Sequence, residues 1–338
     1  MKRINWGIIG LGNVANSHLK SFEKSENCKL KGIASKNLQK LENFKKKINI
    51  EKSFCFNNYE DLIKSSEIDI IYIALPNSYH YEWINKCIDY GKHILVEKPI
   101  TENFFQLKKI KNKLLERNSK VLIYEGFMYK YYPQINKILD LINNNEIGEI
   151  TKIISSFGVN ILTKKKFLFF NKKKKIDKEG RLFNKKLGGG SILDLGCYPV
   201  SFITMLLEKF KFIHFDDYKV FRKKVEVGET GVDIDSKIEM KVNNKIIIEL
   251  SSSFKKNIGL ATEIYGSKGS IVIPNTWTGS SNIILKKENN KDIIVFDEID
   301  DIYLDQINTI SNNLLNNNIG HNIDNMLLNM KIIDQWLN

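Results

Sequence analysis

The chain has 338 residues, of which 42% are hydrophobic and 27% charged, and its formal net charge is +13. This composition excludes a wholly disordered chain, and 5 prolines and 20 glycines exclude a collagen-like or low-complexity one. The length suits two domains, since a domain usually holds about 100–200 residues.

The positive charge does not by itself indicate a nucleic-acid partner, because the lysines are spread along the chain and no nucleic-acid-binding module is recognisable. The densest basic run comprises Lys164–Lys166 and Lys172–Lys175 and surrounds Phe167–Phe170. We interpret this run as a solvated surface loop, with a nucleic-acid or membrane patch as the alternative.

The sequence shows no sign of export or membrane insertion. Met1-Lys2-Arg3 leads directly into a strand-like segment, unlike a secretory signal, and no apolar run approaches the roughly 20 residues that span a bilayer. The cysteines are scattered, with neither a C-x-x-C pair nor zinc-like spacing to histidine, so we expect reduced structural thiols and no metal site. These features predict a cytoplasmic protein.

Residues 1–124 alternate between strand-like and helix-like segments. The expected strands are Asn5–Ile9, Leu30–Ala34, Ser53–Phe56, Ile68–Ala74, His93–Glu97 and Lys120–Tyr124. The expected helices are Val14–Lys24, Leu38–Lys47, one from Tyr59, Tyr79–Tyr90 and Phe104–Arg117. Ile68–Ala74 is apolar at nearly every position, which indicates a central strand buried on both faces of a parallel sheet. We therefore predict a doubly wound α/β domain of the Rossmann type.

Residues 125–338 follow a different pattern, in which most strands follow one another without intervening helices. The expected strands are Thr151–Val159, Phe212–Val220, Val232–Val242, Ile246–Phe254, Ala261–Tyr265, Ser270–Ile273 and Ile283–Leu285. The expected helices are Ile135–Asn143, one ending near Glu208, Tyr303–Asn316 and Ile323–Leu337. This pattern predicts an α+β domain on a largely antiparallel sheet, which offers a broad face for self-association.

A glycine motif follows the first expected strand. Gly10-Leu11-Gly12-Asn13-Val14-Ala15 lies between this strand and a helix, which is the context of a dinucleotide-binding loop with alanine in the third glycine position. Gly10 would make the tight turn, and Gly12 would let a pyrophosphate approach the backbone. A glycine turn without a ligand is the alternative.

The end of the second strand distinguishes the two nicotinamide cofactors. A carboxylate about 20 residues past the glycines would bind the ribose 2′-hydroxyl of NAD. This chain has Ser35 and Lys36 there, whose hydroxyl and ammonium would attract a 2′-phosphate. We therefore predict NADP, with NAD as the less favoured cofactor; the alternative is that Lys36 is one more exposed lysine.

Polar residues follow the fourth and fifth expected strands, at the sheet edge where open α/β folds bind ligands. Leu75-Pro76-Asn77 and His80 follow the fourth strand, and Glu97-Lys98-Pro99 ends the fifth. Farther along the chain, Asp194 and Tyr198 are four residues apart after a triple glycine, so they share a helix face if Pro199 lies in its first turn.

Taken together, these motifs resemble the Gfo/Idh/MocA oxidoreductases. The set comprises the glycine motif, Pro76-Asn77-x-x-His80, Gly91-Lys92-His93 before Glu97-Lys98-Pro99, Glu125–Met128, and Gly188-Gly189-Gly190 before Asp194-x-x-x-Tyr198. Most family members carry histidine at the position of Tyr198. Tyrosine there is similar to the branch of glucose–fructose oxidoreductase, dihydrodiol dehydrogenase and NADP-linked xylose dehydrogenase.

The resemblance implies hydride transfer between NADP and a carbon of a sugar, polyol or cyclic diol that bears a hydroxyl or carbonyl group. It implies a cis peptide bond before Pro99, and a homodimer or homotetramer formed through the second domain's sheet. The cofactor residues expected on these grounds are Gly10, Gly12, Asn13, Val14, Ser35, Lys36, Leu75, Pro76, Asn77, His80, Glu97 and Lys98.

We assign the acid/base role to Tyr198, since oxidation of an alcohol requires a base at the hydroxyl oxygen. A free tyrosine has a pKa of about 10, and the neighbouring ammonium of Lys98 would favour its phenolate. Asp194 would orient the substrate or the lysine. The reverse assignment, with Lys98 as proton carrier, remains open, as do plain structural roles for Asp194, as a helix N-cap, and for Tyr198, as a buried aromatic.

The expected substrate-binding residues are Lys98, Tyr129, Arg181, Asp194 and Tyr198. Tyr129 belongs to a tyrosine group that could line a sugar pocket, although a place in the core is equally compatible with its sequence. His80 has a second interpretation as a helix cap. A nucleotide-sugar or inositol dehydrogenase of the same fold, and a non-catalytic NADP-binding sensor, are the alternative functions; the sensor would need no acid/base pair.

Overall fold

The computed structural model describes residues 2–48, 50–166, 170–210, 217–279, 282–288, 290–318 and 323–338. The chain forms two compact units, one of Met1–Tyr131 with Asp301–Ile323, the other of Tyr132–Asp300 with Asp324–Asn338. These units do not coincide with a division into residues 1–124 and 125–338, because a late helix returns to the first unit.

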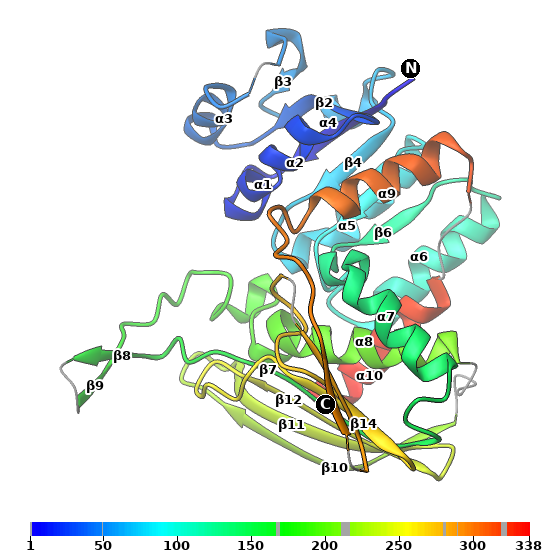
Figure 1. Ribbon diagram of the computed structural model, residues 1–338. Helices are drawn as coiled ribbons and strands as arrows, with labels where there is room; N and C mark the ends of the chain where they lie inside the picture. Colours follow the sequence, from blue (N-terminus) through cyan, green and yellow to red (C-terminus); the bar gives the residue numbers. More distant parts are fainter. Residues whose placement is uncertain are drawn as a thin grey trace. The chain divides into compact units, whose positions relative to one another are not determined.

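A six-stranded sheet forms the centre of the first unit, with strand order β3-β2-β1-β4-β5-β6 and parallel neighbours (Figure 1). Its strands are β1 (Ile4–Ile9), β2 (Cys28–Ala34), β3 (Cys55–Phe56), β4 (Ile70–Ile73), β5 (His93–Val96) and β6 (Ile123–Glu125). The order reverses between β1 and β4, and ligands of open α/β sheets bind at such a point.

The helices of this unit follow the strands in alternation. They are α1 (Asn13–Ser17), α2 (Leu19–Lys24), α3 (Leu38–Lys45), α4 (Tyr59–Lys64), α5 (Asn77–Asp89) and α6 (Phe104–Glu116). Every residue of β4 is buried, so the predicted central strand is confirmed. The expected Rossmann architecture is likewise confirmed.

The late helix α9 (Leu304–Leu315), orange in Figure 1, packs against β1, β2 and α2 of the first unit. Its Ile307 and Ile310 are fully buried in the same core as Trp6. The indole N–H of Trp6 donates to Ser311 Oγ at 3.0 Å. Local pattern predicted the helix but placed it in the wrong unit, because an apolar stripe does not specify which sheet it covers.

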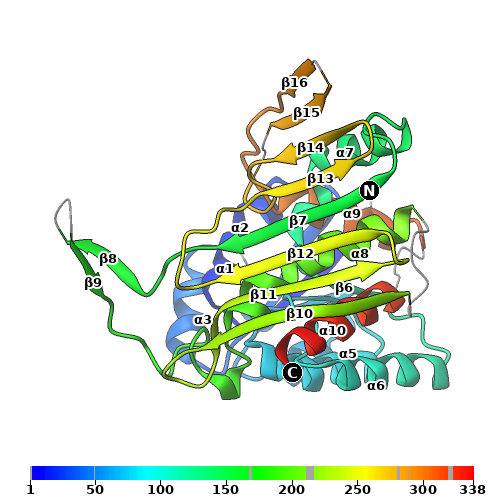
Figure 2. The same cartoon turned by 90° about the horizontal axis from the view of Figure 1, so that it is seen from below.

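An eight-stranded sheet forms the second unit, in the order β10-β11-β12-β7-β13-β14-β15-β16 (Figure 2). Its strands are β7 (Ile150–Gly158), β10 (Tyr218–Val227), β11 (Asp233–Val242), β12 (Ile246–Ser253), β13 (Thr262–Gly266), β14 (Gly269–Ile273), β15 (Ile283–Lys287) and β16 (Asn290–Ile294). All neighbours are antiparallel except β12 and β7, which confirms the largely antiparallel sheet.

Two strands of this sheet depart from the expected pattern. The strand β10 begins at Tyr218, and residues 212–216 of the expected segment lie outside the described residues. The strand β16 was not expected, because its first residues are exposed and polar and show no apolar alternation.

The basic run, expected to be a loop, contributes a hairpin instead. Here β8 (Thr163–Lys166) pairs antiparallel with β9 (Phe170–Lys173), and Figure 2 shows this hairpin apart from the main sheet. Phe167, Leu168 and Phe169 lie outside the described residues.

The helices of the second unit are α7 (Pro133–Asn143), α8 (Cys197–Lys209) and α10 (Ile323–Leu337). The helix α8 packs on β7 and β12, and α10 holds α8 through a hydrogen bond from Asn325 Nδ2 to the carbonyl oxygen of Thr204 at 3.0 Å. Within the described residues one helical stretch, Lys185–Lys209, is long and apolar enough to cross a membrane, contrary to the expectation of no such run. Its apolar window is 94% buried, as in a core helix.

Candidate active site

The loop between β1 and α1 has the backbone of a dinucleotide-binding turn. Gly10 has a φ of +89°, and a Cβ there would lie 2.5 Å from the carbonyl oxygen of Ala74, so no other residue fits. Gly12 precedes α1, and a Cβ added to it would meet nothing within 4 Å. Asn13, which opens α1, is exposed beside it. The open space at Gly12 is what a closely approaching pyrophosphate requires, so these residues fit a dinucleotide.

The end of β2 presents a hydroxyl and an ammonium in place of an acid. Ser35 is buried, and its Oγ accepts a hydrogen bond from the backbone N–H of Asn37 at 3.2 Å. Since a hydroxyl both donates and accepts, its O–H can still donate to an anion. Lys36 is exposed at the same loop. The geometry therefore suits a phosphorylated ribose.

The loops after β4 and β5 are joined by a buried histidine. His80 is fully buried, with Nδ1 2.9 Å from the carbonyl oxygen of Pro99 and Nε2 2.9 Å from that of Leu75. Burial lowers the pKa of His80, so the neutral ring donates to one carbonyl at a time. The side chain thus braces the two loops from within the core. It does not cap α5, whose N-cap is Pro76.

The residues Glu97 and Lys98 are half-buried at the carboxyl end of β5, and the Lys98–Pro99 bond is cis, as expected. The hydroxyl of the fully buried Tyr72 donates to Glu97 Oε1 at 2.5 Å. The backbone N–H of Ile100 donates to Glu125 Oε1 at 2.9 Å. Contacts on both sides therefore fix the backbone that carries Lys98.

Tyr303, the residue that precedes α9, is an aromatic residue that the sequence analysis did not single out. The ring of Tyr303 stacks on His18, with centroids 3.8 Å apart, and His18 also contacts Tyr72. Burial, followed by the charge of Glu97, raises the pKa of Tyr303 to about 12, against the opposing charge of Lys98. Nothing in the local sequence around Tyr303 indicates this position, because it depends on where α9 packs.

Tyr129 is fully buried, and its ring meets Phe127 edge-on at 6.0 Å. This burial favours the interpretation of Tyr129 as a core residue over its assignment to substrate binding. The neighbouring Tyr132 is also buried.

In the second unit the triple glycine leads into a π-helix, Ile192–Gly196, that continues as α8. Pro199 is the third residue of α8, and because α8 continues directly from the π-helix, Pro199 lies within a continuous helix and not in its first turn as the sequence analysis required. A single π-helical turn often marks a functional position in a helix. Asp194 lies in this turn and Tyr198 directly after it.

The carboxylate of Asp194 pairs with Arg181, whose Nη1 lies 2.8 Å from Oδ1. Tyr198 is 7% exposed, and its ring contacts Phe157 and Trp277 with centroids 5.2 and 5.8 Å away. The second unit therefore places a carboxylate–guanidinium pair and a largely buried phenol on one short segment.

A buried carboxylate from β11 anchors the start of that segment. Ser191 Oγ and the backbone N–H of Ile192 donate to Asp233 Oδ2 at 2.6 and 2.7 Å. Gly190 has a φ of +122°, and a Cβ there would lie 2.2 Å from Asp233 Oδ1, so the turn accepts only glycine. Gly190 therefore allows the turn to approach Asp233 closely. The sequence analysis missed this acid because it lies on β11, far from the glycines in sequence.

We expect the stability of the protein relative to an Asp233→Asn variant to rise as the pH falls. Burial raises the pKa of Asp233, so its ionised form costs stability above the raised value and this cost disappears below the ordinary value near 3.8. The difference in the free energy of unfolding should shift toward the natural protein between pH 7 and about pH 4, by about 1.4 kcal/mol per unit of pKa elevation. Urea unfolding at both pH values measures it; a shift toward the variant contradicts the prediction.

Among the described residues, no group of three or more histidine, cysteine, aspartate or glutamate side chains could hold a metal ion. None of the cysteines within those ranges forms a disulfide; Cys28, Cys87 and Cys197 are buried and Cys55 is half-buried.

The parallel sheet, the glycine turn and the second α+β unit define a dinucleotide-binding oxidoreductase. Residues 4–125 match the oxidoreductase family with an NAD-binding Rossmann fold, and residues 135–272 match the GFO/IDH/MocA C-terminal domain. The chain belongs to the GFO/IDH/MocA oxidoreductase family, as the motifs predicted.

Two curated relatives and one solved structure illustrate the similarity. Trans-1,2-dihydrobenzene-1,2-diol dehydrogenase of Xenopus tropicalis is 30% identical over 85% of this chain and 81% of its own length. Glucose-6-phosphate 3-dehydrogenase of Bacillus subtilis is 30% identical over 79% of this chain and 73% of its own. A 3-ketoreductase from Actinomadura kijaniata, crystallised with NADP and TDP-benzene, superposes with a TM-score of 0.82 at 20% identity, over 98% of this chain and 96% of that one. At that identity the structural likeness shows the fold alone.

Proposed function

We propose that this protein is an NADP-dependent dehydrogenase or reductase that transfers a hydride between the cofactor and a CH–OH or carbonyl carbon of a sugar, polyol or cyclic diol. The observation that carries the proposal is the combination of open space at Gly12 with a lysine, and no acid, after β2. The names of the relatives, which include a diol dehydrogenase and a sugar-phosphate dehydrogenase, support the substrate class.

In this proposal the loop Gly10–Val14 holds the pyrophosphate, and Ser35 and Lys36 hold the ribose 2′-phosphate. Leu75, Pro76 and Asn77 line the same sheet edge, while Glu97 and Lys98 lie nearest the nicotinamide. When bound, the cofactor supplies the ring carbon that exchanges the hydride. His80 supports the site from within the core and makes no contact with the cofactor.

In this proposal, residues of this chain accept and donate the proton of the substrate hydroxyl. As the hydride leaves the carbon, the substrate hydroxyl gives its proton to the phenolate of Tyr198, and a carbonyl is left. The ammonium of Lys98 stabilises that phenolate and donates a hydrogen bond to the substrate oxygen. Asp194, held by Arg181, orients a second hydroxyl of the substrate. The proposal requires Lys98 and Tyr198 to reach the same substrate oxygen in the loaded enzyme.

A nucleotide-sugar substrate is the second candidate. The reductase of A. kijaniata binds a TDP compound, and its fold covers nearly the whole chain. A non-catalytic sensor is less well supported, since it would need the glycine turn but neither Lys98 nor Tyr198.

The proposal is tested by a panel of aldoses, aldose phosphates, inositols, vicinal diols and dTDP-sugars, each assayed with NADP and with NAD at 340 nm. We expect turnover of one sugar or diol class, with kcat/KM at least about tenfold higher for NADP, since a charge-assisted contact contributes about 1.5–3 kcal/mol. Turnover that is equal or faster with NAD refutes the cofactor assignment. Cofactor binding without turnover of any class would favour the sensor.

We also propose that the protein forms a homodimer or homotetramer in the cytoplasm. Exposed apolar side chains on β10, β12 and β16, at Phe221, Ile247 and Ile293, support association through the sheet of the second unit. Light scattering coupled to gel filtration tests this; a monomer at micromolar concentration contradicts it.

A further inference from the structure

Two aromatic rings lie beside the lysine that follows β2. Tyr59 opens α4 and Trp83 lies within α5, and their rings meet edge-on with centroids 5.1 Å apart. The Nζ atom of Lys36 lies 5.4 Å from the centroid of Tyr59 and 5.8 Å from that of Trp83. Both distances are within the range of a cation–π interaction. The exposed ammonium of Lys36 therefore lies within cation–π distance of two rings.

Tyr59 is half-buried at the start of α4, beside this loop. Burial raises the pKa of the Tyr59 phenol, and the backbone of Lys36 opposes that rise. Trp83 is 4% exposed, so packing against its neighbours holds its ring in place.

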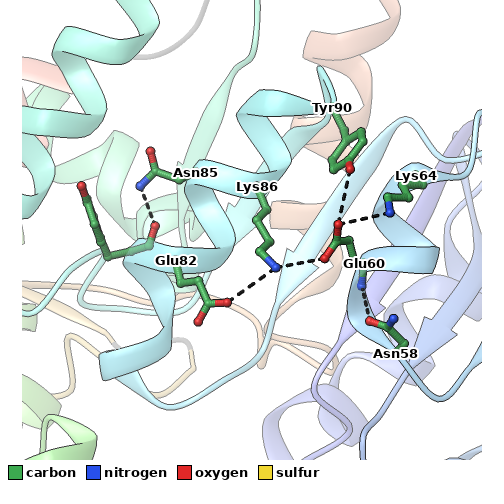
Figure 3. Close-up of polar contacts among 8 residues, drawn as sticks. Asn58, Glu60, Lys64, Glu82, Asn85, Lys86 and Tyr90 are labelled. Carbon is green, nitrogen blue, oxygen red and sulfur yellow. Dashed lines mark hydrogen bonds and ion pairs between the residues drawn. The ribbon is translucent and has the colours of Figure 1, made fainter.

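An ion-pair network joins α4 to α5 (Figure 3). Glu60 of α4 accepts hydrogen bonds from Lys86 at 3.0 Å and from the Tyr90 hydroxyl at 3.4 Å, and pairs with Lys64 at 3.2 Å. Lys86 also lies 4.6 Å from the Trp83 centroid. The charge of Lys86 is therefore engaged by a carboxylate.

Lys36 differs from Lys86 in this respect. Within the described ranges, no ion pair joins Lys36 to a carboxylate, and both rings lie within cation–π distance of its ammonium. An ammonium held by rings keeps its hydrogen-bond donors available for an incoming anion. A free lysine loses side-chain entropy when it is immobilised, and prior placement reduces that cost on binding.

We infer that Tyr59 and Trp83 are positioning residues for cofactor specificity: they hold the ammonium of Lys36 where it meets a phosphate on the ribose 2′ carbon. The inference rests on the proposed function and deepens it. It predicts that loss of the Tyr59 ring weakens binding of a 2′-phosphorylated nucleotide and leaves its unphosphorylated counterpart unaffected.

The test uses isothermal titration calorimetry of the full chain with 2′,5′-ADP and with 5′-AMP. We expect Lys36→Met to weaken 2′,5′-ADP binding by about 10-fold to 100-fold, as for a charge-assisted contact. Tyr59→Leu should weaken it about threefold to fivefold, the effect of an exposed cation–π contact, and Tyr59→Phe, which keeps the ring, by less than about twofold. Binding of 5′-AMP should change by less than about twofold in each, since the lost interactions involve only the 2′-phosphate.

The decisive variant is the double substitution of Lys36→Met with Tyr59→Leu. If Tyr59 acts through Lys36, the double variant binds 2′,5′-ADP no more weakly than Lys36→Met alone. Lys64→Met removes the same charge from α4 and serves as the matched control, with a change below about twofold. Circular dichroism melting shows whether each variant is folded, and Tyr59→Phe retains the packing if Tyr59→Leu does not fold.

Additive losses in the double variant, or equal losses for both nucleotides in Tyr59→Leu, overturn the inference while the proposed function stands. A Lys36→Met variant that binds 2′,5′-ADP normally overturns both the inference and the NADP assignment. A large effect of Tyr59→Phe would assign the contribution to the hydroxyl and also overturn the role of the ring.

Discussion

Replacement of Tyr198 by phenylalanine is expected to lower kcat by about 100-fold to 10,000-fold, the usual contribution of a positioned acid/base group. NADP affinity should change by less than about twofold, since the proposed cofactor residues all lie on the first unit. Phenylalanine keeps the ring that packs against Phe157 and Trp277, so the variant should fold as the natural protein does. Steady-state kinetics with the substrate found in the panel, together with calorimetric titration of NADP, measure both quantities.

Tyr265→Phe is the matched control, because it removes a phenol from β13 of the same unit. Its kcat should remain within about twofold of the natural value, as for a surface change away from the site. Near-normal turnover of Tyr198→Phe would remove Tyr198 from the mechanism. A parallel loss of NADP binding would instead indicate a structural defect.

The second large effect is expected for Lys98→Met, which should lower kcat for alcohol oxidation by about 100-fold or more. The pH dependence separates the two possible roles of Lys98. If the ammonium lowers the pKa of the Tyr198 phenol, its removal raises that pKa, and the acidic limb of the kcat profile moves to higher pH by at least about one unit. Lys98→Arg keeps the charge and should leave the limb near its natural position.

A different result is expected if Lys98 itself carries the proton. The acidic limb would then vanish in Lys98→Met, and Lys98→Arg would be as inactive as the methionine variant, because arginine does not release its proton in proteins. Profiles measured from pH 6 to about pH 10.5 cover the titration of both groups. Unchanged turnover in Lys98→Met contradicts both roles.

The local sequence pattern was sufficient to predict most of the strands, helices and turns of the first unit. A strand, a glycine turn and a helix at the start of the chain predict a dinucleotide loop, because Gly10 must adopt a positive φ that other residues avoid. The buried run at β4 is apolar on both faces, so its central position could be deduced without any partner. Ser35 and Lys36 are recognisable for the same reason, since their position follows from the strand that they end.

Other features were decided by tertiary structure. The helix α9 was predicted, but its packing on β1 and β2, which brings Tyr303 onto His18, depends on contacts about 280 residues apart in sequence. The same is true of Asp233, which fixes the turn before Asp194 from a different strand. His80 and Tyr129 carried polar side chains that favoured ligand contacts, yet both are buried.

The sequence by itself therefore determined the family, the Rossmann sheet, the cofactor loop and the residue types available for proton transfer. Tertiary structure decided which polar residues support the site from the core, where α9 belongs, and how Tyr59 and Trp83 flank Lys36. The physical reason is the range of the forces. Turn geometry and strand burial are set by neighbouring residues, whereas the burial of a side chain depends on the elements that pack over it.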